Sequence, residues 1–168
     1  MVLNAVGRMV ESVWNELPGR FDRLALDGFV VMPNHLHAII IFNDHSALTA
    51  ANVGAPLVGA LVANVMDTHT RAGTRPAPTG AIRKPTLGDI VGAFKSITTD
   101  HYIAGVEYND WLPFVGKLWQ RNYYEHVIRN DGSLERIRSY ILANPACWAY
   151  DRENPESLIP EKEDAWGV

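Results

Sequence analysis

The sequence predicts one domain of the α+β class, on the evidence of its composition, an apolar hairpin pattern and three helical patterns. A chain of 168 residues with 47% hydrophobic and 20% charged residues can form a single hydrophobic core. Two β-rich runs, residues 26–32 and 35–42, are separated by the turn formers Pro33 and Asn34, which favours an antiparallel hairpin. Helical patterns flank this hairpin on both sides in the sequence.

Three segments carry the apolar spacing of helices. In residues 3–17 the apolar side chains recur at three- and four-residue steps, and the proline that follows is expected to end the helix. A second helix is expected over residues 86–102, with Thr86 as its N-cap. A third, residues 131–144, is expected to end where the next residue is proline. Between the last two, residues 111–128 are expected to be extended and to hold one or two strands.

Residues 1–150 are expected to form the domain, and residues 151–168 an acidic tail. The tail holds six acidic and two basic residues, which accounts for the whole formal net charge of −4. The body is therefore neutral, so the negative total does not argue against nucleic-acid binding. Residues 46–82 show neither helical nor alternating periodicity and are expected to be a flexible insertion.

The sequence gives no sign of a membrane segment or an export signal. It lacks a run of about 18 apolar residues, and its start lacks a basic stretch followed by an apolar one. A cytoplasmic location is therefore expected. The single cysteine, Cys147, excludes an internal disulfide framework and cannot form a thiolate zinc site alone.

Two histidines lie in the second β-rich run, within the stretch VVMPNHLHAIIIF. Because strand side chains alternate between faces, His35 and His37 are expected on the same face as Ile39 and Ile41. Two imidazoles at this spacing can bind one divalent cation if a third ligand arrives from elsewhere. The spacing alone is more commonly explained by a strand end with one hydrogen-bonded and one solvated histidine.

The third helix carries a second polar pair. Tyr140 and Asn144 are four residues apart and are expected on one helical face, beside the buried edge. The sequence therefore predicts two polar side chains that point together next to the core.

Four collinear blocks resemble the REP-associated tyrosine transposases, which belong to the single-tyrosine HUH class found in insertion sequences. The blocks are FVVMPNHLHAIIIF, PTLGDIVGAFKSITT, LWQRNYYEHVIRN and IRSYILANPACW. They cover most of residues 1–148 outside the 46–82 stretch. The resemblance implies a ferredoxin-like antiparallel sheet with helices packed mainly on one face.

The resemblance also implies a catalytic site. In this class a His–hydrophobic–His pair holds a divalent metal ion, and a tyrosine on a helix attacks DNA. Carried over, His35 and His37 bind Mg²⁺ or Mn²⁺, Tyr140 is the nucleophile, and Asn144 completes the metal site. The implied function is cleavage and rejoining of single-stranded or hairpin DNA at repeat sequences through a covalent phosphotyrosine. A homodimer is possible in this class.

Other residues are candidates for weaker reasons. Lys95, Arg121 and Arg129 are candidate contacts to the DNA backbone, because Lys and Arg neutralise phosphates. Lys95 is equally well explained as a lysine at the solvated edge of its helix. Tyr123 and Tyr124 are alternative nucleophiles, but they lie in a segment expected to be extended, with no metal ligand at the right offset.

The sequence departs from the family pattern at its start. The family normally begins with a strand ahead of the first helix, and this sequence begins within that helix. In a ferredoxin-like sheet that strand lies centrally beside the histidine strand, so its absence leaves backbone groups to be paired by another segment or a partner chain. Two alternatives stay open: a truncated, catalytically impaired DNA-binding remnant, and a metal-dependent phosphoesterase that uses water as its nucleophile.

Overall fold

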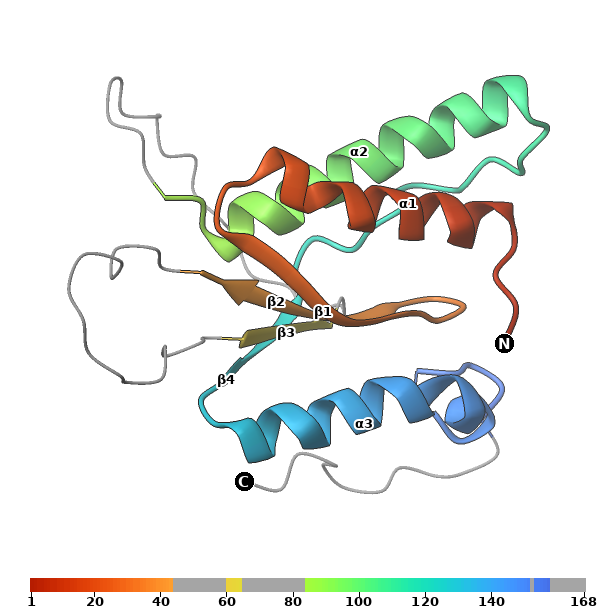
Figure 1. Cartoon of the computed structure of the whole chain (residues 1–168). Coiled ribbons are helices and arrows are strands. Elements are labelled where there is room, and N and C mark those ends of the chain that lie inside the picture. Colours follow the sequence, from red (N-terminus) through yellow and green to blue (C-terminus); the bar gives the residue numbers. More distant parts are fainter. Residues whose placement is uncertain (44–59, 65–83, 152, 158–168) are drawn as a thin grey trace.

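The computed structural model describes residues 1–43, 84–151 and 153–157, together with the backbone of residues 60–64. The predicted α+β class is confirmed (Figure 1). No helix in the described ranges is both long and apolar enough to cross a membrane. The elements follow the order α1 (Ala5–Arg20), β1 (Leu24–Val31), β2 (Leu36–Phe42), β3 (Ala60–Asn64), α2 (Leu87–Tyr108), β4 (Tyr124–Ile128), α3 (Asp131–Cys147) and a 3-10 turn, η2 (Trp148–Tyr150).

The sheet is antiparallel and places the histidine strand near its centre. Its strand order is β1-β2-β3-β4. Asn64 of β3 is paired with His37 of β2 on one side and with Tyr124 of β4 on the other. β3 therefore occupies the central place, beside the histidine strand, that the ferredoxin-like pattern gives to its first strand. Another segment of the chain meets the hydrogen-bonding demand that the sequence left open.

The strand β3 corrects the prediction that residues 46–82 lack regular structure. Residues 60–64 form a strand in that stretch, and the rest of it lies outside the described residues. The physical reason is that β2 is paired with β1 along one edge and needs a partner along the other. Such a demand comes from tertiary structure, so a run of five residues does not reveal it.

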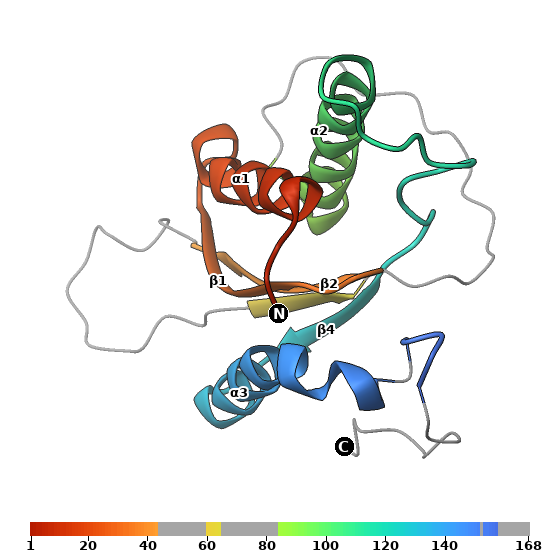
Figure 2. The ribbon, with the colours of Figure 1, turned by 90° about the vertical axis from the view of Figure 1, so that its right-hand side faces the viewer.

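The helices cover both faces of the sheet. Figures 1 and 2 show α1 and α2 on one face and α3 on the other. The core under α1 and α2 contains Leu36 and Ile40 of β2, whereas Ile39 packs with Ile137 and Ile141 of α3. The prediction that helices pack mainly on one face therefore holds for α1 and α2 but not for α3. Because β2 is apolar on both faces, each face must be covered.

Helices α1 and α2 are longer than predicted. α1 continues past Pro18 to Arg20, because a proline in the last turn costs one hydrogen bond while the buried stripe before it stays packed. α2 extends to Tyr108. Its predicted N-cap is confirmed: the Thr86 hydroxyl accepts from the Asp89 backbone N–H at 3.2 Å, and the Thr86 backbone N–H donates to the Asp89 carboxylate at 2.8 Å.

Helix α3 also continues beyond its predicted end. Asn130 caps its start by accepting from the Ser133 backbone N–H at 2.8 Å. The prediction that the helix ends at Asn144 is wrong, since it runs through Pro145 to Cys147 and passes directly into η2. Proline removes one N–H donor, but the buried edge of α3 keeps the helix on the sheet. This extra turn decides where the following residues emerge.

A β-bulge in β1 joins that strand to α3. The register between β1 and β2 shifts around Asp27 and Gly28. Both oxygens of Asp27 accept from the Arg138 guanidinium, at 2.9 Å from Nε and 2.5 Å from a terminal nitrogen. A Cβ added at Gly28 would lie 3.3 Å from Ile39 and 3.6 Å from Ile141, so a small residue lets α3 pack closely here. The bulge and the ion pair together fix α3 on the sheet.

Replacing Asp27 by asparagine should lower stability at neutral pH, because Arg138 loses its charged partner. The hydrogen bond from Arg138 holds the pKa of Asp27 below its ordinary value, against the opposing effect of burial. A carboxylate with a lowered folded-state pKa stabilises the fold above its unfolded pKa of about 4, and this contribution is lost as pH falls through the folded value. Thermal unfolding of wild type and Asp27→Asn should therefore differ at neutral pH and converge progressively below about pH 4.

The matched control is Glu16→Gln, which breaks an exposed ion pair with Arg20 of 3.4 Å. This variant should unfold at nearly the wild-type temperature, because exposed pairs contribute little. A difference between wild type and Asp27→Asn that stays constant from neutral to acid pH would contradict the electrostatic explanation.

Candidate metal and tyrosine site

The two histidines lie at the start of β2, on the side of the sheet that α3 covers. Leu36 and Ile40 point to the core under α1 and α2, and Ile39 points to α3. By strand alternation His37 shares the face of Ile39, as predicted. His35 is 5% exposed and His37 is 1% exposed. Both imidazoles are therefore almost fully withdrawn from water.

The ε nitrogens of the two imidazoles face each other. Their separation is 3.1 Å, and the ring centroids are 4.8 Å apart. Two ligand nitrogens about 2.1 Å from one ion stand roughly 3.0 to 3.4 Å apart at octahedral to tetrahedral angles. The observed separation fits two ligands of one divalent cation. It also permits a hydrogen bond between the rings.

Asn34 selects the tautomer of His35 that a metal ion needs. The Asn34 amide nitrogen donates to the backbone carbonyl of Glu153 at 2.6 Å, so its oxygen is the atom that faces His35 Nδ1 at 2.8 Å. An amide oxygen only accepts, so Nδ1 of His35 carries the proton and Nε2 keeps its lone pair. This arrangement resembles the outer hydrogen bonds that orient metal-ligating histidines in general.

Asp151 completes a group of three possible ligands. Its carboxylate oxygen lies 3.9 Å from His35 Nε2, and the side chain is 11% exposed. The ligand atoms of His35, His37 and Asp151 all lie within 4.8 Å of one another. Two imidazoles and one carboxylate form a ligand set that binds divalent metal ions. The residues present therefore fit a metal ion, and the set does not discriminate strongly among metals.

Burial keeps the imidazoles neutral. Desolvation lowers the pKa of His37 to about 4, helped by the neighbouring His35 and opposed by Asp151. The pKa of His35 is also lowered by burial, and Asp151 again opposes the shift. Metal ligation needs the neutral form, because the ligating nitrogen must have its lone pair free. Both histidines are thus ligand-competent at neutral pH.

Tyr140 stands against this cluster. Its ring centroid lies 5.4 Å from that of His37 in an edge-to-face arrangement, and the residue is 39% exposed. Burial raises the pKa of the phenol, a side-chain hydrogen bond with Asn144 lowers it, and Asp151 and Glu153 raise it further. The phenol is therefore protonated at neutral pH. It touches the histidine cluster while part of it stays accessible to a substrate.

Asn144 lies one helical turn after Tyr140, as predicted from their spacing, and is 4% exposed. Its Nδ2 and the Nδ1 of His37 are buried, and neither has a hydrogen-bond partner among the described residues. Buried polar atoms without a partner are costly and are concentrated at functional sites. The polar groups of this site are thus not fully satisfied by the described part of the chain.

The predicted DNA contacts lie outside this cluster. Lys95 of α2 donates to the backbone carbonyls of Gln120 at 2.7 Å and Asn122 at 3.1 Å, so it anchors the segment before β4. Arg121 is exposed in that segment. Arg129 is exposed just before α3 and lies roughly three helical turns ahead of Tyr140. Of the predicted residues, the structure brings together the two histidines, Tyr140 and Asn144.

The alternative tyrosines lie elsewhere. Tyr123 packs against the core under α1 and α2, with the Lys95 ammonium 5.8 Å from its ring centre. Tyr124 is 49% exposed on β4. Neither has a described ring contact with the histidine pair, whereas Tyr140 does.

Sequence reasoning missed Asp151, which it assigned to an acidic tail. The error follows from ending the third helix at Asn144. Because α3 continues to Cys147 and η2 follows, Trp148 comes within 5.9 Å of His35 between ring centroids, and Asp151 reaches the histidines. A carboxylate shortly after the tyrosine helix was the available signal, since carboxylates commonly complete two-histidine sites.

Comparison with known proteins identifies one relative. The chain is 34% identical over 152 residues to an uncharacterized protein of Haemophilus influenzae, and the match covers 90% of this chain and 71% of that protein. No model of a known protein family matches the chain. No solved structure matches it.

The cluster should bind Mn²⁺, with affinity that depends on each of its three ligands. Titration calorimetry should show one site per chain in wild type and no measurable binding in His37→Ala, because this variant removes a buried ligand. Asp151→Asn should bind at least about tenfold more weakly. Glu156→Gln is the control, since Glu156 is exposed in the same acidic segment, and it should bind as wild type does. Unchanged binding in His37→Ala would show that the metal sits elsewhere.

Proposed function

We propose that this chain, which belongs to the same protein family as the Haemophilus influenzae protein, is a metal-dependent enzyme that cleaves and rejoins single-stranded DNA through Tyr140. Its substrate class is single-stranded or hairpin DNA at repeat sequences, as the resemblance to REP-associated tyrosine transposases implies. We place the activity in the cytoplasm. A homodimer, which the same resemblance allows, stays a prediction.

The contact between Tyr140 and the histidine cluster carries this proposal. A phenol is a weak nucleophile while protonated, and it needs an electrophile that is activated nearby. The Tyr140 ring lies 5.4 Å from that of His37, which in turn faces His35 at 3.1 Å between ε nitrogens. This arrangement supports a nucleophile and a metal-binding group acting on the same phosphate. A structural role alone does not account for a partly exposed phenol beside two buried, neutral imidazoles.

The residues that would hold Mg²⁺ or Mn²⁺ are His35, His37 and Asp151. When bound, such an ion neutralises negative charge on phosphate oxygens and makes the phosphorus more electrophilic. The contribution of the chain is to keep both imidazoles neutral by burial and to orient His35 through Asn34. We expect Asn144 to act mainly on Tyr140, with which it shares a hydrogen bond.

The proposed reaction is an exchange of one phosphodiester bond for another. The hydroxyl oxygen of Tyr140 forms a bond to phosphorus while the bond from phosphorus to the 3′ oxygen breaks. The phenol gives up its proton, and the leaving 3′ oxygen takes up a proton to become a free hydroxyl. The phosphotyrosine keeps the energy of the broken bond, so a later attack by a 3′ hydroxyl reverses the step and rejoins the strand.

A second candidate is a phosphoesterase that uses water. The observation that favours it is the raised pKa of Tyr140, because a phenol that holds its proton is a poorer nucleophile. The Asp151 carboxylate beside the cluster could accept a proton from water. This enzyme would release cleaved DNA and form no bond between protein and DNA. The non-catalytic remnant, by contrast, would bind DNA without cleaving it.

Tyr140→Phe should abolish a covalent protein–DNA adduct that the wild-type chain forms. The assay incubates the protein with Mn²⁺ and a labelled pool of single-stranded oligonucleotides that contain hairpins, and resolves the products on a denaturing gel. The variant loses only the attacking oxygen, so the fold should be retained. Tyr150→Phe is the matched control, because Tyr150 is 68% exposed in η2 beyond the same helix.

An adduct that persists in Tyr140→Phe would contradict the assignment of the nucleophile. Cleavage without any adduct in wild type would favour the phosphoesterase. DNA binding with neither cleavage nor adduct would favour the remnant.

A further inference from the structure

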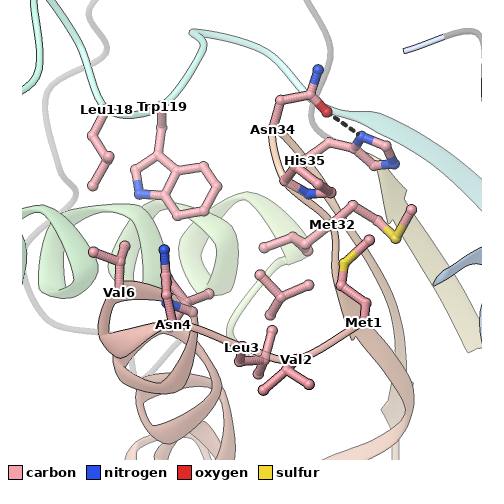
Figure 3. A pocket seen from close by; sticks show the side chains of 15 residues that line it. Met1, Val2, Leu3, Asn4, Val6, Met32, Asn34, His35, Leu118 and Trp119 are labelled. Atoms are coloured by element: carbon pink, nitrogen blue, oxygen red, sulfur yellow. Dashed lines mark hydrogen bonds between the residues drawn. The ribbon is translucent and has the colours of Figure 1, made fainter. Parts of the chain in front are cut away.

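A pocket of about 390 Å³ lies between the start of α1, the turn joining β1 to β2, and the segment before β4 (Figure 3). This volume falls in the range of small-ligand sites. Most of its walls are apolar, and its sides lie on three segments that are far apart in the sequence. The lining includes Leu3, Val6, Met32, His35, Leu118 and Trp119.

Trp119 gives the pocket a rigid aromatic wall. Its indole N–H donates to the hydroxyl of Thr98 at 2.7 Å, and Thr98 is fully buried. Its ring lies 5.5 Å from that of Phe94 between centroids. Two residues of α2 therefore hold the indole, and Figure 3 shows the ring on the side of the pocket opposite Asn34. A fixed aromatic ring can stack on a planar ligand without a further loss of side-chain freedom.

Asn4 adds a directed polar group. Its side-chain oxygen accepts from the Gly7 backbone N–H at 2.8 Å and so caps α1. The amide nitrogen therefore points away from the helix, and Figure 3 shows the Asn4 side chain reaching toward Trp119. A donor beside an aromatic ring suits a planar ligand that carries acceptors on its edge, as nucleobases do.

His35 connects the pocket to the candidate site. The same imidazole lines the pocket and offers its Nε2 to the cluster with His37 and Asp151. A group bound in the pocket would therefore sit beside the place where Tyr140 meets the histidines. For a DNA strand, the base next to the attacked phosphate is the group at that position.

We propose that this pocket binds one unpaired base of the DNA strand, stacked on Trp119 and hydrogen-bonded by Asn4, and so selects which phosphate reaches Tyr140. The inference rests on the proposed function for the identity of the strand. It adds a specificity-determining subsite on the other side of His35 from the tyrosine. Stacking on an aromatic ring tolerates several bases, whereas the Asn4 donor favours bases with a suitably placed acceptor.

The test measures how binding depends on each base. Oligonucleotides that bind the full-length Tyr140→Phe chain are selected from a single-stranded random pool, and each nucleotide of the tightest binder is replaced in turn by an abasic one. One position should lower affinity by roughly tenfold, as expected for the loss of one stacked base. In the double variant with Trp119→Leu, the intact strand should bind about as weakly, and the abasic replacement at that position should have no further effect.

The matched variant is Trp119→Phe, which also loses the hydrogen bond to Thr98 but keeps an aromatic ring. It should retain the sensitive position. Asn4→Ser keeps an N-cap for α1 and removes the amide donor, so it should reduce the preference for one base at that position. Should Trp119→Leu fail to fold by circular dichroism, the Asn4→Ser result decides, with an unchanged base preference counting against the pocket.

The outcomes separate this inference from the proposed function. An adduct through Tyr140 with no position whose effect depends on Trp119 would overturn the pocket and leave the catalysis. A position that depends on Trp119 without any adduct would support the pocket and remove the catalytic step.

Discussion

The burial of β2 on both faces is the constraint on which the rest of the structure depends. A strand whose successive residues are all apolar cannot leave either face in water, so α1 and α2 cover one side and α3 the other. The histidines at its start are buried by the same packing. The helix that covers their face also carries Tyr140, so the meeting of phenol and imidazoles follows from how the sheet is covered.

This burial has opposite consequences for the two kinds of side chain. Desolvation lowers the pKa of His35 and His37, which gives them the neutral form that a metal ion requires. The same effect raises the pKa of Tyr140, which makes it harder to ionise. The site is therefore ready to bind a cation but not ready to attack. Activation of the phenol must come with substrate and metal, which would restrict the reaction to the assembled complex.

The sequence was most informative where local periodicity and side-chain chemistry coincide. The three helices, the hairpin and the shared faces of His37 with Ile39 and of Tyr140 with Asn144 all follow from spacing. The strand β3 does not, because it is recruited by the unpaired edge of β2 rather than by a strong pattern of its own. Asp151 was missed for a related reason: its position depends on α3 continuing through Pro145, which tertiary packing permits and local propensity disfavours.

The account stands on one geometric claim, that a cation held by His35 and His37 lies within reach of the Tyr140 hydroxyl. Anomalous diffraction from crystals grown with Mn²⁺ measures this directly, because the signal locates the ion independently of the protein atoms. The account predicts one peak between the ε nitrogens of the two imidazoles and the Asp151 carboxylate, with the phenol facing it. A peak remote from both histidines, or a Tyr140 ring turned away from an ion bound there, would contradict it.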